Sequence, residues 1–132
     1  MWPFGRRSSL GRLGEKLAVK HLRRKGQKIL ARNYRCPAGE ADVIALDLST
    51  RAETGCETIA FVEVKTRSDD AYVDPESAVD RRKRNQLVRV AEYYLSHHRA
   101  AEYGVRFDVV AVVIGRSGKP RIRHIRDAFE SV

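Results

Sequence analysis

The stretch FVEVKTR, residues 61–67, has the aromatic and β-branched residues of a buried β-strand but also carries charges. Side chains alternate between the two faces of a strand, which places Ile59, Phe61, Glu63 and Lys65 on one face. A carboxylate and an ammonium therefore share a face with large apolar residues. Because ions are seldom buried without a partner or a use, this strand is the first candidate for a functional site.

The composition predicts a globular protein with a loosely ordered segment at 1–7 and a single domain over 8–132. No apolar run approaches the length that spans a membrane, and the basic start is not followed by the apolar region of a secretory signal. Cys36 and Cys56 match no metal or redox spacing, so free thiols are expected. These features predict a cytoplasmic protein that does not associate with membranes.

The formal net charge is +9, and this excess points to a polyanionic partner, most simply nucleic acid. A basic surface that serves only solubility is the alternative. The candidate phosphate-contacting residues are Arg23, Arg24, Lys25, Arg67, Arg81, Arg82, Lys83 and Arg84, with a further cluster at Arg121, Arg123 and Arg126. No motif for base recognition is present, so structure-selective or nonspecific contact is expected.

A first helix is predicted from a cap at Ser8 or Ser9 to a stop at Gly26. Helical spacing predicts an inward stripe with Glu15 on its flank. The members of that stripe are Leu10, Leu13, Leu17, His21 and Leu22, with Ala18 alongside.

Strands are predicted at 27–35, 40–48 and 57–67, the last two forming an antiparallel hairpin. A second helix is predicted from Asp74 as N-cap and Pro75 as first residue to about His98, with Ala78 and Val79 in its first turn. The apolar segment 105–114 predicts a central strand reached by a parallel crossover, and 121–125 an edge strand. The expected fold is α/β, a mixed sheet with helices on its faces.

The predicted hairpin brings Asp42, near the start of one strand, close to Glu63, near the end of the other. Two adjacent carboxylates repel each other unless a cation lies between them, and oxygen ligands alone favour Mg²⁺ or Mn²⁺. Lys65 would lie beside such a cation, where an ammonium can orient a water or stabilise a phosphorane-like transition state. A plain ion pair on a solvated face is the alternative.

The motifs GEAD at 39–42 and FVEVKTR at 61–67 resemble the acid…(D/E)-x-K signature of the restriction-endonuclease-like PD-(D/E)XK superfamily. With GRLGEKLAVKHLRRKG, ILARNYR and RFDVVAV, they resemble more closely the YraN-like family of predicted bacterial endonucleases. That family is distantly similar to archaeal Holliday junction resolvases. The resemblance covers most of the chain and implies a restriction-endonuclease-like αβββαβ core.

The resemblance also implies roles for individual residues. Asp42 and Glu63 would hold the metal, Lys65 would be the catalytic lysine, and Glu15 matches the helix glutamate that related resolvases add. Supporting positions are Glu40, Gln86 and Asp108. Ala41 stands where the superfamily motif has its proline.

The expected function is therefore a metal-dependent endonuclease that hydrolyses DNA phosphodiester bonds, with selectivity for branched or recombining DNA. One alternative is a nucleic-acid-binding protein of the same fold with weak or no catalysis. Another is a protein-interaction scaffold whose charge is incidental. Related resolvases are dimers, and a homodimer is therefore expected by analogy alone.

Overall fold

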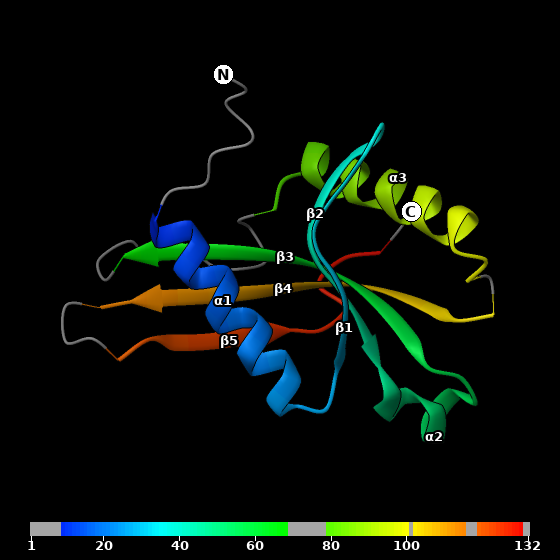
Figure 1. Cartoon of the computed structure of the whole chain (residues 1–132), viewed down its shortest axis with the longest axis horizontal. Coiled ribbons are helices and arrows are strands. Elements are labelled where there is room, and N and C mark those ends of the chain that lie inside the picture. Colours follow the sequence, from blue (N-terminus) through cyan, green and yellow to red (C-terminus); the bar gives the residue numbers. More distant parts are fainter. Residues whose placement is uncertain (1–8, 69–78, 101, 116–118, 131–132) are drawn as a thin grey trace.

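Five strands form one sheet in the part of the chain that the computed structural model describes, residues 9–68, 79–100, 102–115 and 119–130 (Figure 1). The elements in chain order are α1 (Ser9–Arg24), β1 (Lys28–Cys36), β2 (Gly39–Asp47), η2 (Leu48–Thr50), α2 (Arg51–Thr54), β3 (Thr58–Ser68), α3 (Arg81–His97), β4 (Gly104–Ile114) and β5 (Arg121–Ile125). The predicted α/β class and element order are confirmed. The polar stretch after β2 contains the short helical turns η2 and α2.

The strands follow one another across the sheet in chain order, from β1 to β5. β1, β2 and β3 are antiparallel neighbours, β3 and β4 are parallel, and β5 pairs antiparallel with β4 at the edge. The hairpin, the crossover through α3 and the edge strand are therefore as predicted.

The β1–β2 hairpin bends away from β3 near the start of β2 (Figure 1). Pairing between β2 and β3 runs from Asp47 opposite Thr58 to Val43 opposite Val62. β3 remains paired with β4 beyond that point, as far as Ser68 opposite Ile114. Asp42 therefore lies where the two central strands separate.

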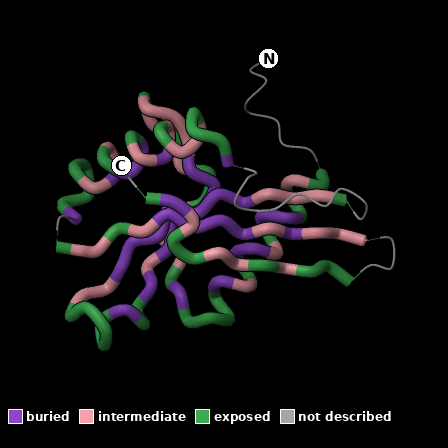
Figure 2. The backbone as a smooth tube through the Cα atoms, turned by 180° about the vertical axis from the view of Figure 1, so that it is seen from behind, coloured by how far each residue is buried: buried purple, intermediate pink, exposed green. Residues whose placement is uncertain are grey.

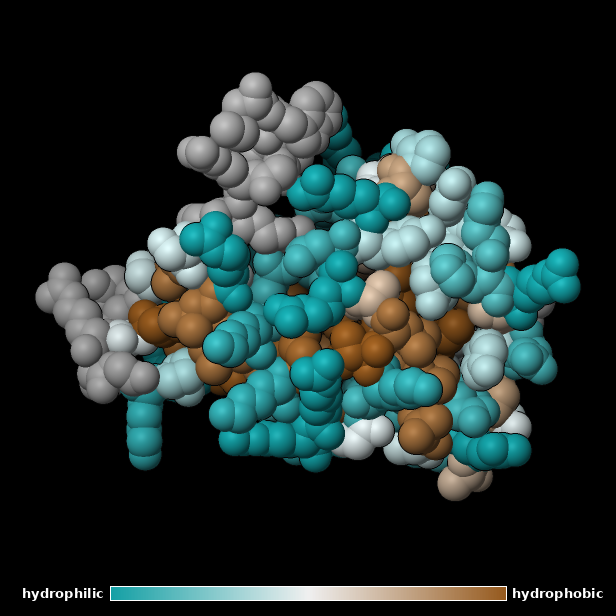
Figure 3. All heavy atoms as spheres, viewed as in Figure 1, coloured by the Kyte–Doolittle hydropathy of each residue, from teal (hydrophilic) through white to brown (hydrophobic). Residues whose placement is uncertain are grey.

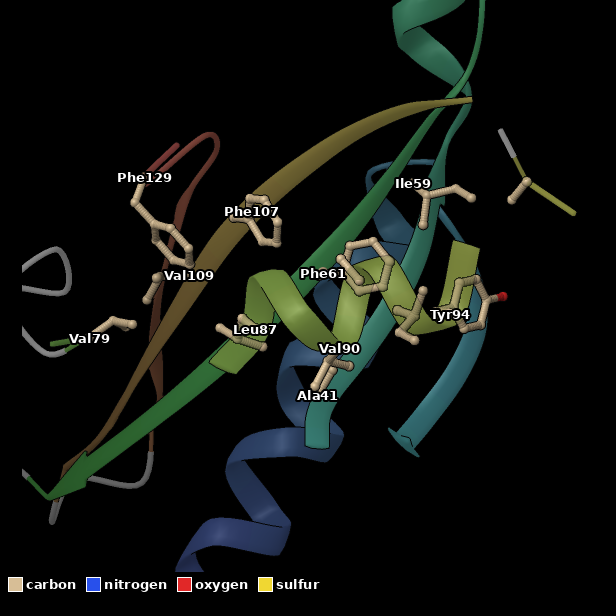
Figure 4. Packing of buried hydrophobic residues seen from close by; sticks show 13 residues of the cluster. Ala41, Ile59, Phe61, Val79, Leu87, Val90, Tyr94, Phe107, Val109 and Phe129 are labelled. Carbon is tan, nitrogen blue, oxygen red and sulfur yellow. The ribbon is translucent and has the colours of Figure 1, made fainter. Parts of the chain in front are cut away.

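A hydrophobic core covers each face of the sheet, so the central strands are buried on both sides (Figure 2). On one face, Ala18 and Leu22 of α1 pack with Val62 of β3. On the other, α3 lies across the sheet and places Val90 and Tyr94 against Phe61 (Figure 4). The predicted alternation along β3 is confirmed, because Phe61 and Val62 belong to different cores.

The predicted inward stripe of α1 is wrong at its first two members. Leu10 and Leu13 are 38% and 44% exposed, whereas the buried residues of α1 are Gly14, Glu15, Ala18, Val19 and Leu22. The physical reason is close packing: a Cβ at position 14 would collide with the side chain of Thr66 on β3. The face carrying the smallest residue therefore turns toward the sheet, and Leu13 turns out. Hydrophilic residues otherwise cover much of this side of the molecule (Figure 3).

The second helix begins later than predicted. α3 starts at Arg81, and the N-cap is Asp80, whose side chain accepts a hydrogen bond from the backbone N–H of Lys83 at 2.9 Å. Asp74 and Pro75, the expected start, lie outside the described residues, as do Ala78, Ser8 and the segment 1–7. The helix ends at His97, close to the predicted end. The charged residues from Arg81 to Arg84 therefore form the first helical turn and point in different directions.

Both cysteines, Cys36 and Cys56, are free, as expected. Among the described residues, no helix combines the length and apolar character needed to cross a membrane.

Candidate functional site

The carboxyl groups of Asp42 and Glu63 meet at the point where β2 leaves β3. Asp42 Oδ2 accepts a hydrogen bond from the backbone N–H of Val64 at 2.8 Å, so its side chain substitutes for a strand contact that the bend of β2 removes. The two acids are only 7% and 5% exposed and are hydrogen-bonded to each other. The sequence prediction that these acids lie together is confirmed.

Two lysines flank the Glu63 carboxylate. Lys65 Nζ lies 3.3 Å from Oε2, and Lys83 Nζ lies 3.7 Å from Oε1. Lys65 comes from the same strand, whereas Lys83 comes from the first turn of α3. The site therefore combines two acids with two ammonium groups brought from different elements.

Burial raises the pKa of Glu63 to about 7, and the negative charge of Asp42 adds to this effect. The ammonium groups of Lys83 and Lys65 oppose the rise but do not cancel it. Glu63 Oε1 is buried and accepts no hydrogen bond from the described residues. A buried acid pair with an unsatisfied oxygen is an environment that a proton or a cation stabilises.

The Asp42–Glu63 pair fits Mg²⁺ or Mn²⁺, because both of its donor groups are carboxylates and neither is a thiolate or an imidazole. No three His, Cys, Asp or Glu side chains in the described ranges are grouped closely enough to hold a metal ion. The pair therefore offers two protein ligands, and waters would complete the coordination of such an ion.

Gln86, one of the supporting positions, lies on α3 and contacts the site through Lys83. Its Oε1 accepts a hydrogen bond from Lys83 Nζ at 3.0 Å. Its side chain also lies against Gly39, where an added Cβ would be 2.6 Å from Gln86 Cδ. Gly39 has a φ of +141°, so both its conformation and its missing side chain suit this position. Gly39 of the GEAD motif thus leaves room for the side chain of Gln86, which contacts Lys83.

Lys83 is the site residue that the sequence interpretation missed, since it was assigned only to the phosphate-contacting stretch. A signal was present in the helical spacing. Lys83 precedes the buried Leu87 by four residues and Val90 by seven, which places it on the inward face of α3. Arg81 and Arg82 lie off that face and are exposed.

Glu15 and Glu40 have different surroundings. Glu15 is 5% exposed on the face of α1 that packs on the sheet, next to Gly14 and its contact with Thr66. Glu15 therefore lies on the face of the sheet opposite to the one that α3 covers. Glu40 Oε2 forms an ion pair with Arg35 Nε at 3.2 Å across the β1–β2 hairpin.

Asp108 belongs to a second buried cluster, away from the acid pair. Arg106 donates hydrogen bonds to both its oxygens, at 2.8 and 2.9 Å, and His124 Nε2 lies 2.9 Å from Oδ2. Arg106 also pairs with Asp47 at 2.9 Å. Asp108 stands opposite Val62 in the register, so it lies on the α1 face, whereas Glu63 lies on the α3 face. The cluster ties β2, β4 and β5 together.

The predicted phosphate-contacting residues fall into two groups. Arg23, Arg24, Lys25, Arg81 and Arg82 are exposed. Arg84, in contrast, donates from Nε to the carbonyl of Val79 at 2.8 Å and lies over the ring of Phe129. Arg67 is half-buried and donates to the carbonyl of Thr66. On β5, Arg121 and Arg123 are exposed, while Arg126 lies 3.5 Å from Asp47.

Comparison with known proteins gives a family. The model of "Uncharacterised protein family UPF0102" matches residues 14–112. The UPF0102 protein of Mycobacterium ulcerans (strain Agy99) is 46% identical over 119 residues, which is 90% of this chain and 93% of the relative. The UPF0102 protein of Trichlorobacter lovleyi is 43% identical over 122 residues, 92% of this chain and 91% of the relative.

Among solved structures, Pyrococcus furiosus SfsA in complex with Ca²⁺ aligns over 89% of this chain and 62% of that chain, with 14% identity and a TM-score of 0.35. A likeness this weak carries no argument about fold or function. The family match and the relatives at 43–46% identity show that the chain belongs to the uncharacterised protein family UPF0102.

Proposed function

We propose that this protein is a metal-dependent endonuclease that hydrolyses phosphodiester bonds in DNA, built on a restriction-endonuclease-like αβββαβ core. One observation carries the proposal: Asp42 and Glu63 form a buried, hydrogen-bonded acid pair where β2 leaves β3, with Lys65 Nζ 3.3 Å from Glu63. The net charge of +9 supports a polyanionic substrate, and the lack of a base-reading motif supports selection by DNA structure rather than sequence.

Asp42 and Glu63 are the residues that would hold Mg²⁺ or Mn²⁺. When bound, such an ion supplies Lewis acidity toward a phosphate oxygen and lowers the pKa of a water. The remaining chemistry falls to the side chains of this chain. Lys65, beside Glu63, orients the attacking water and stabilises the negative charge that grows on the phosphate. The acid pair, held by the Val64 N–H, keeps this arrangement rigid.

Exposed cations near the start of α3 support substrate binding by the same site. Arg81 and Arg82 lie in the first turn of the helix that brings Lys83 to Glu63. Arginine suits phosphate because its planar guanidinium donates several hydrogen bonds and stays charged. Contacts of this kind fix a DNA backbone in position without reading its bases.

A second candidate function is nucleic-acid binding without catalysis. The observation that favours it is the pairing of Glu63 with both Lys65 and Lys83. Two acids and two ammonium groups compensate one another, so the cluster also makes sense as a structural ion network. Such a protein would bind DNA with a steep salt dependence and would be indifferent to Mg²⁺.

The test is cleavage of a panel of duplex, single-stranded, flapped and four-way DNA with Mg²⁺ or Mn²⁺. Glu63→Gln and Lys65→Ala should each lose about 100-fold or more of the cleavage rate. Two matched controls make the same chemical changes away from the site. Glu57→Gln alters an acid that pairs with Arg51, and Lys28→Ala alters an exposed strand lysine; both should cut like wild type.

Cleavage by none of the proteins, with DNA still bound, would favour the binding protein. Equal cleavage by wild type and by both site variants would remove Glu63 and Lys65 from the chemistry. A failure to bind any nucleic acid at low salt would favour the scaffold instead.

A further inference from the structure

Two ammonium groups already flank Glu63 before any divalent cation is present. Asp42 and Glu63 carry two negative charges when ionised, and Lys65 and Lys83 carry two positive ones. A buried acid pair without counter-charge is unfavourable. The two lysines therefore partly compensate the negative charge of the acid pair, as a divalent cation would.

The two lysines hold different oxygens of the Glu63 carboxylate. Lys65 lies beside Oε2, at 3.3 Å. Lys83 lies beside Oε1, at 3.7 Å, and Oε1 is the buried oxygen that accepts no hydrogen bond within the ranges that the structure describes. A cation that uses the free lone pairs of Oε1 must approach the position next to Lys83. Lys83, rather than Lys65, is thus placed to compete with it.

Lys83 is held near the carboxylate without being locked to it. Its Nζ donates to Gln86 Oε1 at 3.0 Å, and Gln86 is seated against Gly39. The distance of 3.7 Å to Glu63 is that of an ion pair without a hydrogen bond. The side chain is 27% exposed, so the ammonium also reaches solvent. Gln86 gives the ammonium a partner that it keeps if Glu63 becomes occupied.

We propose that Lys83 is a built-in counter-ion that competes with the divalent cation for Glu63, and that Gln86 retains its ammonium beside the site once the cation is bound. The inference rests on the proposed metal site. Lys83 therefore weakens cation binding, and removing it should strengthen that binding.

The experiment is calorimetric titration of the full chain with Mn²⁺ alone. Lys83→Met should bind Mn²⁺ about tenfold more tightly than wild type, because a like charge near the cation has been removed. Lys83→Arg, which keeps the charge, should restore the wild-type affinity. Arg89→Met is the matched control, since it removes an exposed positive charge from the same helix, and its affinity should equal that of wild type.

A merely structural role for Lys83 predicts the opposite sign, because a damaged site binds cations less tightly. Equal or weaker Mn²⁺ binding by Lys83→Met overturns the inference while leaving the nuclease proposal intact. Mn²⁺ binding without DNA cleavage by wild type overturns the nuclease proposal while the competition is still measured. Binding by neither protein overturns both. Lys83→Gln repeats the test if the methionine variant does not fold.

Discussion

Glu63 and Asp108 are both buried acids on neighbouring strands, but their surroundings differ in kind. Asp108 receives two hydrogen bonds from Arg106 and a third from the backbone N–H of Asp127, with His124 also in contact. Burial alone would raise the pKa of Asp108, but the hydrogen bonds from His124 and Arg106 outweigh it and leave the pKa lowered. Glu63 Oε1 receives no hydrogen bond from the described part of the chain, and the pKa of Glu63 is raised to about 7.

This contrast separates an acid whose negative charge the folded structure stabilises from one whose negative charge it does not. A fully satisfied carboxylate has no lone pair left for a ligand, and its charge is stabilised by the folded state. An acid with a raised pKa and a free oxygen is unfavourable in its ionised form until a proton or a cation binds it. Burial does not distinguish the two residues, whereas the number and kind of their partners does.

The largest expected effect on stability is from Asp108→Asn. The asparagine keeps the shape but removes the negative charge that Arg106 and His124 contact, so we expect the free energy of unfolding to fall by about 3 kcal/mol or more. Urea denaturation near neutral pH measures it. Glu40→Gln is the matched control, because its pair with Arg35 is partly exposed and should be worth less than about 1 kcal/mol. A loss no larger than that of the control would contradict the structural role of the Asp108 cluster.

A second effect of similar size should appear in the pH dependence of stability. Glu63 has a pKa of about 7 in the folded protein. In the unfolded chain its pKa returns to about 4.3, so only the folded chain holds the proton between these values. The Glu63 contribution is therefore fully present below about pH 4.3 and is lost as pH rises through about 7, a total of about 4 kcal/mol.

The measurement is urea denaturation across this range, without divalent cations, for wild type and Glu63→Gln. Other groups titrate in the same window, so the informative quantity is the difference between the two proteins. The variant should lack the wild-type loss on raising the pH. Adding Mg²⁺ should reduce the loss in wild type, because a cation stabilises the ionised acid pair. An equal pH dependence in both proteins would show that the acid pair is not strained.

Much of this comparison could be predicted from the sequence, because it depends on local patterns. Strand alternation gave Glu63 the same face as Phe61, and the hairpin direction brought Asp42 to it. The pairing of Arg106 with Asp108 follows from their positions two residues apart on one face of a strand. Each of these inferences requires only the period of one element or the direction of two.

The incorrect and missing predictions concern contacts between elements that are distant in the sequence. The orientation of α1 depends on Gly14 meeting Thr66, and nothing near Gly14 in the sequence signals that contact. Asp74 followed by Pro75 and the isolated Asp80 are both acceptable helix starts, and the described helix uses Asp80. Lys83 was hidden in a run of like charges, whose members acquire separate roles only once the helix has a buried face.

The smallest predicted effect tests how Gly39 and Gln86 position Lys83 beside Glu63. Gly39→Ala adds a Cβ that would lie 2.6 Å from Gln86 Cδ, at a φ of +141°. We expect a loss of about 2 kcal/mol in the free energy of unfolding, part from the backbone and part from the collision. Gly55→Ala is the control, because Gly55 also has a positive φ of +84° but has nothing within 4 Å of an added Cβ. Its cost should be the backbone part alone, about 1 kcal/mol.

The double variant Gly39→Ala with Gln86→Ala isolates the collision, because the shorter side chain at position 86 leaves room for the new Cβ. Relative to Gln86→Ala alone, the substitution at Gly39 should then cost no more than the substitution at Gly55. An undiminished cost in the double variant would mean that Gly39 is required for its backbone conformation only. The position of Gln86 would then be set by α3 alone, and Gly39 would not contribute to positioning Lys83.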